Sequence, residues 1–285
     1  KKGRDKMTLG TILVCLTTPD HAETLMKLAV PLARKHNAHL VGLHTLEALA
    51  IYPGIAMHIP APAFESFNKS QAKEAEAIRG IFDIYTKNED FPSEWRLLKA
   101  QSTSATDRMV ESARTVDLVI MSHEDNATER YDQRNARSTV IRSSGRPVIV
   151  VPLGYEGPTV GENILLGWTS TREAARASHD LLTVVDEGAA VCVLEVGVGQ
   201  QAALASSDTI ELANMYARHG LKVSLEQRDG TTKSVAEIIN QTAFEKGTDL
   251  IVVGAFGHSK AYDFVVGAAT YDLLDRAKCP IMFSS

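Results

Sequence analysis

Short apolar runs alternate with longer amphipathic stretches along the chain, and this alternation predicts its secondary structure. The short runs have the length and the branched side chains typical of strands buried on both faces of a sheet. The longer stretches carry apolar residues at spacings of three and four, which predicts helices that bury one face. In the N-terminal half we expect strands at residues 12–16, 40–43, 118–121 and 148–151, and helices at 22–36, 70–86 and 106–115.

The C-terminal half repeats the order of the N-terminal half, so the chain contains two copies of one unit. TILVCLTT at residues 11–18 is echoed by NILLGWTS at 163–170, VDLVIMS at 116–122 by TDLIVVG at 248–254, and RPVIVV at 146–151 by CPIMFS at 279–284. A turn-rich linker follows residue 152, which predicts domains at 8–152 and 162–285. In the second copy we expect strands at 164–167, 190–196, 222–227, 250–253 and 281–283, and helices at 171–185, 206–219, 233–246 and 267–277.

The first copy is the longer one between its first and fourth strands. Ile164 follows Ile12 by 152 residues, whereas Leu250 follows Leu118 by 132 residues. The first copy therefore carries about 20 extra residues, and prolines 53, 60 and 62 would interrupt a helix there. We expect a loop or lid over Ala50–Asn68, with a surface insertion without function as the alternative.

Strands that alternate with helices imply right-handed crossovers and a parallel, doubly wound sheet. We therefore predict an α/β protein of two tandem Rossmann-like domains, each a mainly parallel sheet flanked by helices. In such sheets, ligands bind beyond the carboxyl ends of the strands, at the point where the strand order reverses. The residues directly after the strands are the first place to look for a site.

Three glycines in the second copy form the most specific candidate site. Gly254 and Gly257 follow the predicted strand at 250–253, and Gly267 opens the predicted helix at 267–277. A glycine lets the backbone approach an anion closely and adopts positive φ at little cost. Successive backbone N–H groups and the positive end of a helix beginning at Gly267 would suit a polyphosphate. The alternative is that the glycines only permit a tight turn between a strand and a helix.

The pattern G-x2-G-x9-G between a fourth strand and a last helix, followed by Cys279-Pro280 and an apolar strand, resembles the nucleotide-binding signature of the universal stress protein family. The resemblance implies five strands in each copy and an internal pseudo-dimer, with Pro147–Val151 beside Pro280–Phe283. It also implies a stress-linked cytoplasmic protein that binds adenine nucleotide, ATP or AMP, with or without Mg²⁺. Further homo-oligomerisation is left open.

The nucleotide site implied by this resemblance draws on the ends of two strands and on the loop and helix that follow the fourth strand. We expect it to comprise Gly167, Trp168, Thr169, Val196, Gly254, Gly257, His258, Ser259, Lys260, Gly267, Ala268 and Thr270. Thr169 stands where the family usually has an aspartate, and Ala268 stands where a hydroxyl residue often follows the third glycine. These two departures from the family pattern concern the affinity for the nucleotide or the preference for its base. Trp168 is expected to pack in the core rather than to stack on a base.

The first copy lacks the glycine pattern. Its loop would begin at Ser122, where His123, Glu124 and Asp125 follow, and the two acids would repel a phosphate. We predict that this copy does not bind a nucleoside triphosphate in the family manner. His123 with the two acids has no second ligand pair at a suitable spacing, so we expect no metal site.

Composition and charge narrow the classes of function. The formal net charge of −5 provides no broad basic field for a nucleic-acid backbone. No apolar run approaches the roughly 20 residues of a membrane span. Cys15, Cys192 and Cys279 lie far apart in or beside apolar segments, which indicates buried free thiols.

Binding is a better expectation than catalysis, because the sequence has no P-loop, nucleophile elbow or zinc-binding helix motif. Two alternatives stay open. One is an enzyme that hydrolyses ATP or phosphorylates itself. The other is a nucleotide-independent scaffold, or a module that binds a small molecule or a protein, with the proline-bearing segment as a lid.

Overall fold

The computed structural model describes residues 8–47, 61–100, 104–123, 135–157, 160–197, 205–256 and 263–285. The first copy shows the predicted alternation of strands and helices. Four of its five strands form where predicted, because leucine, isoleucine and valine side chains fill both sides of the sheet, so that β4 is buried throughout; β3 was not predicted. The elements are β1 (Thr11–Cys15), α1 (Pro19–His36), β2 (His39–Leu46), α2 (Ala61–Thr86), β3 (Ser93–Lys99), α3 (Ala105–Ala113), β4 (Leu118–Ser122), α4 (Ala136–Ser143) and β5 (Val148–Val151).

The second copy repeats this order, and its helices begin and end at residues suited to the purpose. Ser234 and Glu237 form a capping box at the start of α7, which ends at Gly247 with a left-handed φ of 61°. The elements are β6 (Asn163–Trp168), α5 (Arg172–Val184), β7 (Ala190–Gly197), α6 (Ser207–Arg218), β8 (Lys222–Asp229), α7 (Val235–Lys246), β9 (Leu250–Gly254), α8 (Asp263–Arg276) and β10 (Ile281–Ser284).

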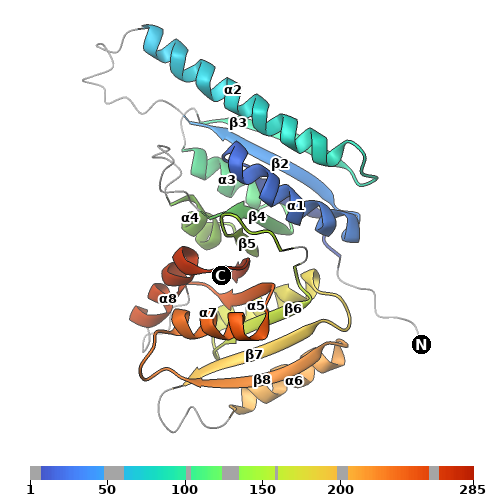
Figure 1. Ribbon diagram of the computed structural model, residues 1–285, viewed down its shortest axis with the longest axis vertical. Helices are drawn as coiled ribbons and strands as arrows, with labels where there is room; N and C mark the ends of the chain where they lie inside the picture. The colour runs from blue at the N-terminus through green and yellow to red at the C-terminus, as the bar shows by residue number, and fades with distance from the viewer. Residues whose placement is uncertain are drawn as a thin grey trace.

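The strands of both copies join in one ten-stranded sheet with the order β3-β2-β1-β4-β5-β10-β9-β6-β7-β8. Every neighbouring pair within a copy is parallel. Helices α1, α2, α5 and α6 cover one apolar face, and α3, α4, α7 and α8 cover the other. The predicted α/β fold with two tandem Rossmann-like units is confirmed, and the two units are stacked along the long axis of the molecule (Figure 1).

The two last strands join the copies, as the internal pseudo-dimer requires. β5 and β10 pair antiparallel, with Ile281 opposite Val150 and Phe283 opposite Val148. Each strand thereby covers an edge of the other that would otherwise expose unpaired backbone groups. Because the pair is antiparallel, the amino end of β5 lies beside the carboxyl end of β10, and Ser285 Oγ donates to the Ile141 carbonyl at 2.8 Å.

The expected loop over Ala50–Asn68 is wrong in its C-terminal part. Residues 61–68 are the first turns of α2, which has 26 residues, whereas α6 at the matching place has 12. Pro62 is tolerated because it lies in the first turn, where its missing N–H has no intrahelical partner to lose. Residues 50–60 of the expected lid lie outside the described residues. Much of the extra length in the first copy is therefore helix (Figure 1).

The three cysteines are free and buried, as expected. Burial raises the pKa of the Cys15 and Cys279 thiols to about 12. No helix in the described part of the chain is both long enough and apolar enough to span a bilayer.

Candidate functional site

The candidate site lies where the strand order of the second copy reverses. From β6 the chain proceeds to β7 and β8 on one side, and it returns to β9 and β10 on the other. β6 and β9 are parallel neighbours, with Gly167 opposite Val253. Their carboxyl ends therefore place Trp168 and Thr169 beside Gly254. A crevice at such a reversal point is where doubly wound folds bind their ligands.

Gly254 is required by close packing of the protein against itself. A Cβ at this position would lie 2.5 Å from Ala174 N and 2.6 Å from the carbonyl carbon of Glu173, both backbone atoms of the first turn of α5. Gly167 is also tightly packed, since a Cβ there would lie 3.1 Å from Val253 Cγ1. The two glycines bring β6, β9 and the start of α5 into close contact. The sequence argument that Gly254 leaves room for an anion missed this role.

The helix whose N-terminus lies at the carboxyl ends of β6 and β9 is α5. Thr171 is its N-cap, and its hydroxyl accepts from Ala174 N at 3.3 Å. Glu173 in the first turn is only 6% exposed and accepts from the Arg172 guanidinium at 2.8 Å. That carboxylate offsets part of the positive end of the helix. The sequence pattern assigned no such role to α5.

The prediction that a helix begins at Gly267 is wrong. α8 begins four residues earlier, at Asp263, so that Gly267 and Ala268 lie inside the helix. An acid in the first position is favourable at a helix N-terminus, and Phe264, Val265 and Val266 contain no helix breaker. Thr270, further along α8, is 2% exposed. Gly257, His258, Ser259 and Lys260 lie outside the described residues, and their roles stay predictions.

The remaining predicted residues differ in their exposure. Thr169 is exposed, and its Oγ1 lies 3.3 Å from Thr171 Oγ1. Trp168 is 8% exposed and packs in the apolar cluster that includes Leu212 and Tyr216, as expected for a core aromatic. Val196 is half-buried near the end of β7. Thr169, directly after β6, is therefore the predicted residue at the end of this strand that is open to a ligand.

Two carboxylates near the same edge were missed by the sequence analysis. Asp208 accepts from the Ser170 hydroxyl at 2.8 Å, which ties the start of α6 to the loop after β6. Glu195, on β7 beside Trp168, accepts from Thr209 Oγ1 at 2.9 Å and from Ser206 N at 3.2 Å. Carboxylates of this kind can accept hydrogen bonds from hydroxyl or amino groups of a ligand. The sequence did contain a signal for the position of Asp208, because the pattern Ser206-Ser207-Asp208 is typical of the start of a helix.

The chain resembles one known protein family in both of its copies. The universal stress protein family model matches residues 8–152 and again 160–284. This chain belongs to the universal stress protein family. Among curated proteins the chain has no match.

Solved structures similar to this universal stress protein include three of comparable length. A universal stress protein from Archaeoglobus fulgidus is 12% identical, with 96% of each chain covered and a TM-score of 0.69. A Pseudomonas aeruginosa protein of unknown function is 14% identical, with 98% of this chain and 93% of that chain covered and a TM-score of 0.60. A putative universal stress protein from Pseudomonas aeruginosa is also 14% identical, with 99% and 95% covered and a TM-score of 0.58. At these identities the likeness concerns the fold.

The matching place in the first universal stress protein copy has a different character. β4 ends at Ser122, which is 8% exposed, and His123 N donates to the Val151 carbonyl at 2.8 Å. Glu124 and Asp125 lie outside the described residues. Within the described ranges, no three His, Cys, Asp or Glu side chains gather as a metal site would need.

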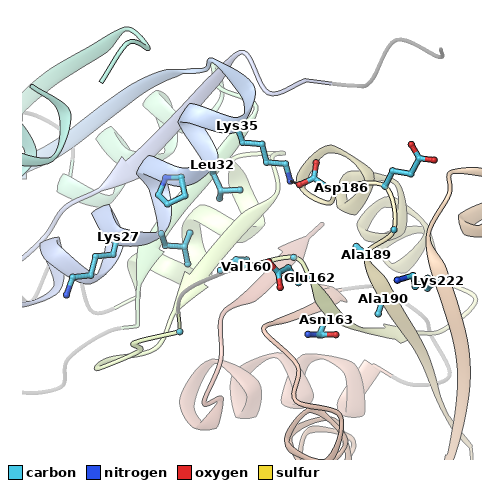
Figure 2. Close-up of a pocket in the computed structure, with 16 residues that line it drawn as sticks. Lys27, Leu32, Lys35, Val160, Glu162, Asn163, Asp186, Ala189, Ala190 and Lys222 are labelled. Atoms are coloured by element: carbon cyan, nitrogen blue, oxygen red, sulfur yellow. Dashed lines mark ion pairs between the residues drawn. The ribbon is translucent and has the colours of Figure 1, made fainter. Parts of the chain in front are cut away.

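A pocket of about 530 Å³ lies between the two universal stress protein copies, at the edge of the sheet opposite Gly254. It is bounded by α1, by the linker and by the amino ends of β6, β7 and β8 (Figure 2). Lys35 reaches across it, with its Nζ 2.6 Å from Asp186 and 2.7 Å from the Val184 carbonyl at the end of α5. Lys27, Glu162 and other charged side chains line the remainder. Its walls therefore carry both signs of charge.

Proposed function

We propose that this universal stress protein binds one adenine nucleotide, ATP or AMP, in its second copy, and that it acts in the cytoplasm as a binding protein rather than as an enzyme. The observation that carries the proposal is the position of the glycine pattern. It starts at the carboxyl end of β9, next to β6, where the strand order reverses. Function is assigned to this site and not to the fold, because the fold serves many functions.

The described residues at the carboxyl ends of β6 and β9 suit the sugar and phosphate parts of such a ligand. Thr169 and Ser170 are exposed directly after β6. The Thr169 hydroxyl can donate to or accept from a ribose hydroxyl, and the Ser170 hydroxyl, which donates to Asp208, can accept from one. The start of α5 directs backbone N–H groups and the positive end of a helix toward the same edge. We propose that Mg²⁺ binds together with the phosphates of the nucleotide, because this ion is commonly coordinated by phosphates and one or two carboxylates.

The test is calorimetric titration of the purified protein with ATP and with AMP, each with and without Mg²⁺. We expect one nucleotide per chain, and loss of binding in Gly257→Val, because the added side chain restricts the loop and fills the space for phosphate. Asp125→Val is the matched control, since residue 125 holds the same place in the repeat of the first copy. Unchanged binding in Gly257→Val, or lost binding in Asp125→Val, contradicts the assignment to the second copy.

A nucleotide-independent role in binding a small molecule is the second candidate, and the pocket between the copies is the observation that favours it. Its volume of about 530 Å³ is within the usual range for small-molecule sites, which often lie between domains. Leu32→Trp would fill this pocket from α1, at the edge of the sheet opposite Gly254. If wild type gives no heat with ATP or AMP, metabolite-induced changes in melting temperature that are lost in Leu32→Trp would support this candidate.

A further inference from the structure

Phe256 holds an unusual backbone conformation at the start of the glycine loop. Its φ is +53°, in the left-handed region that bulky side chains rarely adopt. Among the described residues, the other non-glycine with positive φ is Asn37, which closes α1 in a conformation common at helix ends. Phe256 has no such ordinary explanation. Neighbouring groups must therefore stabilise the conformation.

The group that lies against Phe256 comes from the first copy. The guanidinium carbon of Arg142, at the end of α4, lies 3.7 Å from the centre of the Phe256 ring. Nη2 of Arg142 donates to the Tyr271 hydroxyl at 3.1 Å, and the Tyr271 ring meets the Phe256 ring edge to face at 5.7 Å. The neighbouring Ala255 N–H donates to the Ser284 carbonyl at 2.7 Å. Arg142 thus closes one side of a small cluster around the loop.

The antiparallel join between the copies explains how Arg142 reaches this place. The amino end of β5 pairs with the carboxyl end of β10, so the end of α4 that leads into β5 lies at the carboxyl edge of the second copy. The residue of the second copy that matches Arg142 is Asp275, because Asp275 follows Arg142 by as many residues as Pro280 follows Pro147. Asp275 instead pairs with Arg137 of α4 at 2.9 Å. The sequence difference therefore places a cation against Phe256 at the carboxyl end of β9.

We propose that Arg142 is a positioning residue, supplied by the first copy, which holds Phe256 in its left-handed conformation at the carboxyl end of β9. Its planar guanidinium stacks on the aromatic face, an attraction between a cation and the ring quadrupole. This gives the degenerate first copy a role in the site of its neighbour. The effect on nucleotide affinity rests on the proposed function, whereas the effect on the loop backbone does not.

The experiment compares Arg142→Gln, Arg142→Lys and wild type, with Arg137→Gln as the matched control from the same helix and the same junction. Hydrogen exchange of the Ala255 amide, followed in the nucleotide-free protein by mass spectrometry with fragment resolution, reports local opening at the carboxyl end of β9, where this amide donates to the Ser284 carbonyl. We expect exchange about two- to fivefold faster in Arg142→Gln, the size of an exposed cation–π contact. Arg142→Lys should recover part of the protection, because it restores the cation, and Arg137→Gln should match wild type at this amide.

Titration with ATP forms the second arm, with the affinity of Arg142→Gln expected to fall about two- to fivefold relative to Arg137→Gln. In a Phe256→Leu background, the Arg142→Gln change should then have no further effect on the exchange. Equal exchange in Arg142→Gln and Arg137→Gln, or a full effect in the absence of the Phe256 ring, would overturn the proposal. Faster exchange in a protein that binds no nucleotide leaves the positioning role standing and overturns the proposed function.

Discussion

Replacing Gly254 by alanine tests whether the first glycine of the signature serves packing before it serves any ligand. The added Cβ would lie 2.5 Å from Ala174 N and 2.6 Å from the carbonyl carbon of Glu173. Both are backbone atoms in the capped first turn of α5, so the clash is relieved only if α5 moves away from β9. Overpacking of this kind typically costs about 1–3 kcal/mol. We expect a less stable protein even without nucleotide.

Gly80→Ala is the matched control, with the same added methyl group at an open position. Gly80 lies in α2, and a Cβ there would meet nothing within 4 Å. Alanine is favoured over glycine inside a helix by about 1 kcal/mol. In scanning calorimetry, each kcal/mol corresponds to a shift of about 2–4 °C for chains approaching this size. The melting temperature should fall for Gly254→Ala and rise for Gly80→Ala.

An unchanged or raised melting temperature for Gly254→Ala would refute this reasoning. It would mean that α5 does not crowd the end of β9, and that the glycine is retained only for approach of a ligand. If the temperature falls as expected, loss of nucleotide binding in this variant cannot be assigned to the loop alone. For that reason the binding test uses Gly257→Val.

Four further predictions concern buried and bridging groups. Cys15 and Cys279 should resist thiol reagents at pH 8.5 in the native state and react in urea, which a colorimetric thiol assay would check. The pKa of these two thiols is about 12 in the folded protein, against an ordinary value of 9.0. Between these pH values the folded protein keeps thiol protons that the unfolded chain loses. The free energy of unfolding should therefore fall as the pH rises from 9.0 toward 12. Tyr216→Phe should lower the free energy of unfolding, measured in urea titrations, by about 0.5–1.5 kcal/mol, because a buried hydrogen bond of 2.9 Å to a carbonyl of α5 is lost. An unchanged free energy of unfolding would show that this hydrogen bond does not stabilise the protein. Lys35→Met should destabilise the protein by about 1 kcal/mol at low salt, and by less at high salt, because its partner Asp186 is exposed; an effect independent of salt would indicate lost packing instead.

The sequence alone was sufficient for the repeat, the alternation of elements and the fold class. Continuous apolar runs predict buried parallel strands whatever their neighbours, and β1, β4, β9 and β10 form where those runs lie. The sequence did not locate β3. This edge strand, Ser-Glu-Trp-Arg-Leu-Leu-Lys, has one exposed side and no continuous run of buried apolar residues. The start of α2 was also missed, since a proline in the first turn has the same local signature as a proline in a loop.

For the site, the sequence determined which glycines to examine, because their spacing is a local property of the chain. Only the tertiary structure decided that Gly254 is crowded by α5, that the N-terminus of α5 lies at the carboxyl ends of β6 and β9, and that Asp208 and Glu195 lie near the same edge. Contacts between the two copies depend, in addition, on the direction in which the copies join. The antiparallel pairing of β5 with β10 sets that direction, and it is the physical reason why Arg142 of one copy lies against Phe256 of the other.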